Sequence, residues 1–97
     1  ALEEASWRTL LQLRTAAYGD ADARTVDAAW QLEGVLRGRG GTREADAIRR
    51  RYVVPLLEAD PASLDEARAA KRRDIEQTER EEARAASAQR VAVSSGK

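Results

Sequence analysis

A glycine-rich turn divides the most informative stretch of this sequence, residues 25–57, into two helical halves. Gly38, Gly40 and Gly41 supply the turn, because glycine adopts the positive φ angles that a helix C-terminus and a tight turn require. The stretch therefore predicts a helical hairpin, with Thr42 capping its second helix. Apolar residues recur on both sides at spacings of three and four, which place them on one face of each helix: Val26, Ala29, Leu32 and Leu36, then Ala45, Ile48 and Tyr52. These faces need further neighbours to cover them.

A helix is also predicted on the N-terminal side of the hairpin, from Leu2 to Tyr18. Its apolar residues are spread over a face broad enough to meet two neighbours. They are Leu10, Leu13 and Ala17, flanked by Trp7, Leu11 and Tyr18. The acidic residues of the loop that follows, Asp20 and Asp22, suit the positive N-terminus of the next helix.

Pro55 leaves two alternatives for the second helix of the hairpin. Proline lacks the N–H that would bond to Arg51, and it restricts Val54. The helix either stops at Val54 or kinks there and continues. Leu56 and Leu57 stay in phase with the preceding apolar residues, which favours a kinked helix that ends at about Ala59.

A fourth, long helix is predicted from Leu64 to about Gln89, with residues 91–97 as a flexible tail. Ser63 and Glu66 have the spacing of a capping box. Between its ends this helix carries only two large aliphatic residues, Leu64 and Ile75, which is too few for a coiled-coil seam. We expect its first half, through Ile75 or Thr78, to dock on the hairpin, and its second half to project. Domain boundaries are thus expected at 1–62, 63–90 and 91–97.

Composition limits the core and the chemistry. The chain has 97 residues, which is one small domain, and only four aromatic residues, so alanine must let its helices approach closely. Seventeen basic and seventeen acidic residues cancel, so no net field attracts nucleic acid or an anionic membrane. Histidine and cysteine are absent, which removes the usual acid–base and thiolate groups of catalysis. No enzyme activity, cofactor or metal is therefore expected.

Several other segments have some features of a binding site. The segment 38–41 lacks the lysine and serine or threonine of a phosphate-binding loop. Asp20, Asp22 and Asp27 lack the glycine and terminal glutamate of a calcium loop. Two basic runs, 49–51 and 71–73, are splayed around their helices and diluted by acidic neighbours. We interpret them as solvated surface, with an acidic peptide and nucleic acid as alternatives.

The source and setting of the chain are also expectations. Arginine outnumbers lysine and alanine is abundant, which suggests a GC-rich bacterial genome. The chain starts at Ala1 inside a predicted helix, so we expect a fragment of a larger protein. No apolar run resembles a signal peptide or a membrane-spanning helix, and a cytoplasmic location is expected.

The hairpin resembles a tetratricopeptide repeat of the kinesin-light-chain type. Thr25-Val26, Glu44-Ala45 and Ala5, forty residues before Ala45, match this repeat pattern together with Leu32, Leu36, Gly40 and Ile48. The resemblance covers about residues 2–57, in which the first helix is the second half of a preceding repeat. It implies a fold of one and a half repeats. It also implies a concave groove that receives peptides, lined by the first helix of the hairpin at Asp27, Trp30, Gly34 and Arg37.

Trp30 has two interpretations. Tryptophan and arginine are frequent contributors to binding energy at interfaces, which favours a groove contact. In a core with so few large side chains, Trp30 is also suited to fill the seam against the first helix near Leu10 or Leu13, and this core interpretation is favoured. The sequence leaves both open.

The expected fold is all-α with four helices, and the expected function is protein–protein interaction or oligomerisation within a bacterial scaffold or regulatory protein. The alternative is an assembly element in which the long charged helix is the working part and the hairpin anchors it. A protein or peptide partner is expected, including a second copy of the chain, which would pair through an open edge at Trp7, Leu10 and Leu11. Nucleic acid and membrane are not expected partners.

Overall fold

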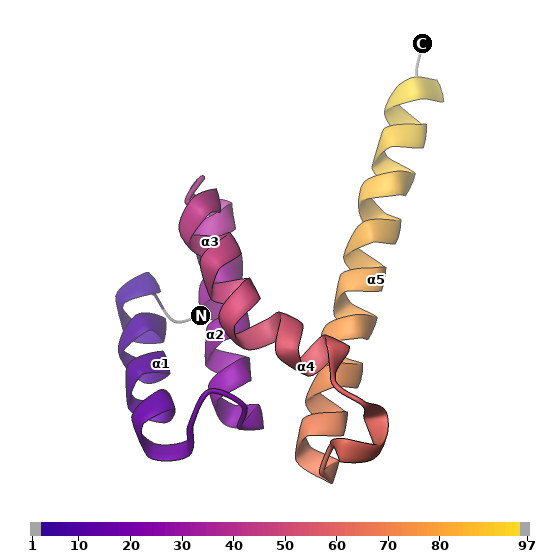
Figure 1. Ribbon diagram of the computed structural model, residues 1–97. Helices are drawn as coiled ribbons and strands as arrows, with labels where there is room; N and C mark the ends of the chain where they lie inside the picture. Colours follow the sequence, from indigo (N-terminus) through magenta and orange to yellow (C-terminus); the bar gives the residue numbers. More distant parts are fainter. Residues whose placement is uncertain (1–2, 96–97) are drawn as a thin grey trace.

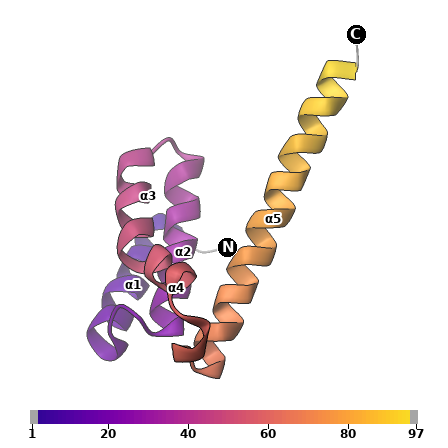
Figure 2. The same cartoon turned by 45° about the vertical axis from the view of Figure 1, so that its right-hand side comes forward.

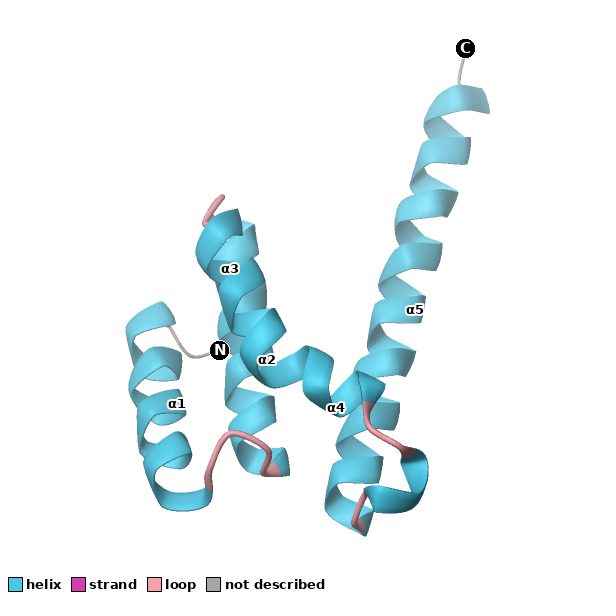
Figure 3. Cartoon of the chain, in the orientation of Figure 1, coloured by secondary structure: helices cyan, strands magenta, loops and turns pink. Residues whose placement is uncertain are grey.

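The computed structural model describes residues 3–95, with side chains through residue 91 (Figure 1). Within that range the protein is all-α, with four main helices and no strand, as predicted (Figure 3). Three of these helices are α1 (Glu4–Tyr18), α2 (Ala23–Gly38) and α5 (Glu66–Ser95). The other is continuous but bent: α3 (Thr42–Ile48), a π-helical segment (Arg49–Val53) and α4 (Val54–Glu58). The predicted start of the first helix at Leu2 lies outside the described residues.

The bend in the third helix follows from Pro55. The N–H of Val54 bonds to the carbonyl of Arg49, five residues earlier, so the backbone widens just before the proline. α4 then turns away from α3 toward α5 (Figure 1). The helix ends at Glu58, and Ala59 is extended, with a ψ of 148°. The kinked helix to about Ala59 is thus the correct one of the two alternatives.

α2 is the central helix, and it buries residues on two sides. Toward α1 and α3 it contributes Ala28, Ala29, Leu32 and Leu36 to a cluster that Leu11, Ala45 and Tyr52 complete. Toward α4 and α5 it contributes Val26 to a second cluster with Val53, Leu56 and Ile75. Ala28 and Ala29 of α2, together with Ala45, are fully buried, which lets the helices approach closely. The core therefore consists of two small hydrophobic clusters, and α2 contributes residues to both.

α5 docks through its first half and projects beyond the body (Figure 2). Ile75 is fully buried, whereas all residues from Arg80 to Val91 are exposed. The radius of gyration is 15.3 Å, larger than the roughly 12–13 Å of a compact domain of this length. α5 thus has a docked first half and an exposed second half.

Neither predicted helix cap, Thr42 or Ser63, is correct. α2 is capped by Asp22, which was expected only to suit the positive N-terminus of that helix: its Oδ1 accepts from the N–H of Arg24 at 2.8 Å. Hydrogen bonds from the side chain and backbone of Arg24 lower the pKa of Asp22 to about 2. Thr42 does not cap α3; it is the first residue of that helix, and Gly41 precedes it without a side-chain cap.

Ser63 was also predicted wrongly as a cap. It lies in a short 3-10 turn, Pro61–Ser63, and its hydroxyl donates to the carbonyl of Asp60 at 2.7 Å. Leu64 is extended, so α5 starts two residues later than predicted. Asp65 caps it instead, because its Oδ1 accepts from the N–H of Arg68 at 2.8 Å.

The C-terminal part differs from the predicted tail. α5 continues to Ser95, past the expected end near Gln89, so residues 91–95 are helical. Residues 96–97 of the predicted tail lie outside the described range. In the described part of the chain, no helix combines the length and apolar character that crossing a membrane requires.

Candidate functional site

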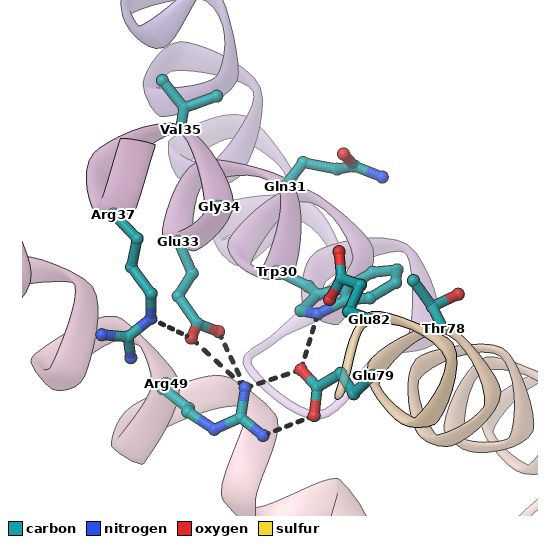
Figure 4. Close-up of a pocket in the computed structure, with 10 residues that line it drawn as sticks. All are labelled: Trp30, Gln31, Glu33, Gly34, Val35, Arg37, Arg49, Thr78, Glu79 and Glu82. Carbon is teal, nitrogen blue, oxygen red and sulfur yellow. Dashed lines mark hydrogen bonds and ion pairs between the residues drawn. The ribbon is translucent and has the colours of Figure 1, made fainter. Parts of the chain in front are cut away.

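A groove of about 780 Å³ lies between α2 and the point where α5 leaves the body (Figure 4). One wall is the exposed face of α2, with Gln31, Gly34 and Val35. The opposite wall is α5, with Thr78 and Glu82. We call this the α2–α5 groove. Its base holds the aromatic and charged side chains Trp30, Glu33, Arg37, Arg49 and Glu79.

Trp30 lies at the junction of α2 and α5 and is half-buried. Its ring packs against the second core cluster, and its Nε1–H donates to Oε2 of Glu79 at 3.1 Å. The Nζ of Lys71 lies 5.4 Å from the ring centroid, within the range of a cation–π contact. Trp30 therefore does not fill the seam against α1. One part of it anchors α5, and another part faces the groove.

Arg49 joins the three segments that form the base of the groove. Its guanidinium donates to both carboxylate oxygens of Glu79, at 2.8 Å each, and to both of Glu33, at 3.2 Å. Arg49 opens the π-helical segment, so the widened turn that precedes Pro55 also carries this side chain. π-helical turns recur at functional sites. Here the turn places one cation between carboxylates from α2 and α5.

Glu33 is the most buried charge of the site, with 5% of its side chain exposed. Besides Arg49, it accepts from Nε of Arg37 at 2.9 Å. Arg37 in turn donates to Asp46 of α3 at 2.8 Å. A buried carboxylate between two guanidinium groups is compensated, and removing either partner would leave it costly to keep charged.

The electrostatics favour permanent charge over proton transfer. The bidentate hydrogen bonds to Glu79, with further help from Glu33, raise the pKa of Arg49 above its ordinary value. The same contact with Arg49, together with the N–H of Trp30, lowers the pKa of Glu79 despite its partial burial. Neither group is therefore tuned toward neutral pH, as an acid–base catalyst would be. The arrangement suits recognition by shape and charge.

Three of the four residues predicted to line a binding stripe lie at the groove. Trp30, Gly34 and Arg37 all line it. Gly34 is exposed, with no atom within 4 Å of the position a Cβ would take. Asp27 lies outside it, on a shallower hollow closer to the start of α5. There its carboxylate binds Nζ of Lys71 at 2.8 Å and lies 3.7 Å from Arg14.

The predicted self-association edge on α1 is only partly exposed. Leu11 is 7% exposed and belongs to the first cluster, so it does not lie on an open edge. Trp7 and Leu10 are half-buried against the same cluster. The most exposed large apolar side chain of α1 is Leu13, at 62%. α1 thus has its core face covered by this chain and an outer face around Leu13 that is open.

The basic runs are largely paired with acidic residues of other helices or of their own. Arg49 binds Glu79 and Glu33, and Arg51 binds Asp20. In the second run, Lys71 binds Asp27 and Asp74, and Arg72 binds Glu76. Ion pairing is thus the main role of these runs.

Sequence reasoning missed Glu33, Arg49 and Glu79 as residues of the site. Glu33 and Arg37 are four residues apart on one helix, a spacing that could have suggested their pairing. Arg49 was noticed only as part of a basic run, and nothing local connects it to Glu79. No group of three or more potential metal ligands occurs within the described residues.

No family model, curated protein or solved structure matches this chain. The fold class is all-α, and the site is defined by its geometry alone.

Proposed function

We propose that this chain is a protein–protein interaction module that binds a partner segment in the α2–α5 groove. The observation that carries this proposal is the groove itself, which combines a partly exposed tryptophan with an open helix face at Gly34. Glycine in a helix interior costs about 1 kcal/mol relative to alanine. A glycine there with empty space above it leaves room for the backbone of a partner to approach α2 closely.

The charges of the groove support a peptide or helix as the partner. Glu82 lines the outer wall, and within residues 3–95 it has no ion pair or hydrogen bond. The Arg49 network below it is satisfied internally and rigid. A partner with a basic side chain for Glu82 and small or apolar residues beside Trp30 fits this arrangement. We further propose that the α1–α3 region is tetratricopeptide-like, and that the protein acts as a non-enzymatic scaffold in a bacterial cytoplasm.

A selection from a random peptide library displayed on phage tests the proposal. Peptides that bind the full chain are measured again on Gly34→Gln. The Cβ of this variant has no neighbouring atom within 4 Å, and the rest of the side chain occupies space at the groove. Leu13→Gln, an exposed substitution on α1, is the matched control. We expect affinity to fall at least tenfold on Gly34→Gln and to remain within twofold on Leu13→Gln. If the selected peptides bind Gly34→Gln with unchanged affinity, the groove is not the binding site.

A second candidate function is an assembly element in which the projecting half of α5 is the working part. The observation that favours it is the exposure of all side chains from Arg80 to Val91 on a helix that continues to Ser95. Arg80→Glu and Arg84→Glu, neither of which lines the groove, separate the two functions. Loss of peptide binding in these variants with retention in Gly34→Gln would assign the function to the projecting helix.

A further inference from the structure

We propose that the α2–α5 groove is occupied by the projecting half of α5 from a second copy of this chain, in an antiparallel two-fold dimer. The inference rests on the proposed function, because it names the partner segment. We call the segment Arg80–Ser95 the arm. At 1.5 Å per residue it is about 24 Å long, and its described side chains are all exposed.

The groove opens in the direction in which the arm projects. α2 and α5 diverge toward the C-terminus of α5, as both ribbon views show (Figures 1 and 2). An arm that enters from the open end must therefore run antiparallel to the α5 it meets. A two-fold axis across the arms then inserts each arm into the groove of the other copy, which closes the assembly at two chains.

The proposed register pairs opposite charges. The two-fold axis passes beside Ala86 of both antiparallel arms. Glu82 of one copy then lies opposite Arg90 of the other, and the symmetry gives this pair twice in the dimer. Within the described part of one chain, neither Glu82 nor Arg90 has an ion-pair or hydrogen-bond partner. Glu82 is already on the wall of the groove. The arm thus supplies an unpaired basic residue for Glu82.

The neighbours of this pair are compatible with the same register. Between Glu82 and Arg90 the arm carries alanine at 83, 85, 86 and 88, so two arms meet without large side chains between them. The helical turn at Arg90 then faces Gly34, where the surface of α2 is open. The other cations at the groove are already engaged: Arg37 with Glu33 and Asp46, and Arg49 with Glu33 and Glu79.

Charge reversal tests the register in solution. Sedimentation equilibrium on the full chain, from about 10 to 500 μM, should give a reversible dimer. In a dimer of the Glu82→Arg variant, both inter-chain pairs become arginine against arginine. In a dimer of the Arg90→Glu variant, both pairs become glutamate against glutamate. Each single variant should weaken dimerisation at least tenfold. The double variant E82R/R90E restores opposite charges and should return the dissociation constant to within about threefold of the original.

Mixing the two single variants gives a further test of the two-fold arrangement. A mixed dimer of Glu82→Arg with Arg90→Glu has opposite charges at both pairs, so the mixture should dimerise when neither variant does alone. Arg43→Glu, an exposed reversal on α3, is the matched control and should have no effect. Leu13→Arg tests the outer face of α1 and should also leave dimerisation unchanged.

Two results would overturn the inference. One is a monomer throughout the concentration range; the other is a dimer that resists both charge reversals or is abolished by Leu13→Arg. Either result leaves the groove free for a different partner. Failure of the dimer does not exclude peptide binding in the groove, because Gly34→Gln can still abolish the binding of a selected peptide to the monomer.

Discussion

Arg49 and Glu79 are thirty residues apart in the chain and bind each other through two parallel hydrogen bonds of 2.8 Å. The pair joins the π-helical segment to α5 at the last point where α5 contacts the body. Beyond it, the helix projects. The groove beside Trp30 exists because this contact fixes where α5 departs.

A double-mutant cycle measures the strength of this contact. Both side chains are about one-third exposed, so solvent reduces the interaction but does not remove it. For Arg49→Met and Glu79→Gln we expect a coupling free energy of about 0.5–3 kcal/mol in urea unfolding. A coupling within error of zero would mean that the pair does not hold α5. The control is the cycle of Arg72→Met with Glu76→Gln, an i,i+4 pair within α5. Its coupling free energy should be only about 0.2–0.5 kcal/mol.

Asp65 and Ser63 should differ in how much they stabilise the start of α5. Asp65→Ala removes the acceptor of the Arg68 N–H and should lower the free energy of unfolding by about 0.5–2 kcal/mol. Ser63→Ala removes only an exposed hydroxyl contact with the Asp60 carbonyl and should cost less. Thermal melts of the two variants decide between them. A larger loss for Ser63→Ala would restore the capping box that the sequence suggested.

Gly34→Ala should stabilise the protein. The position is helical and exposed, and a methyl group would meet no atom within 4 Å. The expected gain in unfolding free energy is about 0.5–1 kcal/mol. Gly40→Ala is the matched contrast, because Gly40 has a φ of +85° and the substitution there should destabilise. If Gly34→Ala also destabilises, the space above α2 is not open.

Hydrogen exchange should divide α5 into two parts. Amide protons before Glu79 belong to the docked half, with Ile75 fully buried. Those after it lie in a helix whose described side chains, through Val91, are all exposed, and they should exchange much faster than the amides of Leu32 to Leu36. The experiment is done at low micromolar concentration. Protection of the arm that appears only at high concentration would support the dimer, and strong protection at every concentration would contradict the projecting arm.

Local patterns predicted the helices because each helix repeats its apolar residues with its own period. Val26, Leu32 and Leu36 identified α2, and Ile75 identified the docked half of α5. The caps were harder to predict. Ser63 and Asp65 are both good capping residues. Leu64 between them is extended and packs, partly buried, against the second cluster, and the helix starts at Glu66.

The resemblance to a tetratricopeptide repeat pointed to part of the site, and the residues that only tertiary structure brings together were missed. Trp30 and Gly34 were expected at a groove because the resemblance places them on one stripe of the hairpin's first helix. Asp27 belongs to that stripe too, but Lys71 holds it in another hollow. Arg49 and Glu79 come together only after the chain bends at Pro55 and returns, and no local pattern encodes that path.

The two indole N–H signals of the protein give the most direct test of the groove. The chain has two tryptophans, Trp7 on α1 and Trp30 at the groove. Peptides recovered from the selection are titrated into ¹⁵N-labelled protein at a concentration where the chain is monomeric. We predict that the Trp30 indole signal shifts in proportion to binding while the Trp7 signal stays in place, because only Trp30 lines the groove and donates to Glu79. A shift of the Trp7 signal with an unchanged Trp30 signal would place binding on α1 and contradict the proposed site.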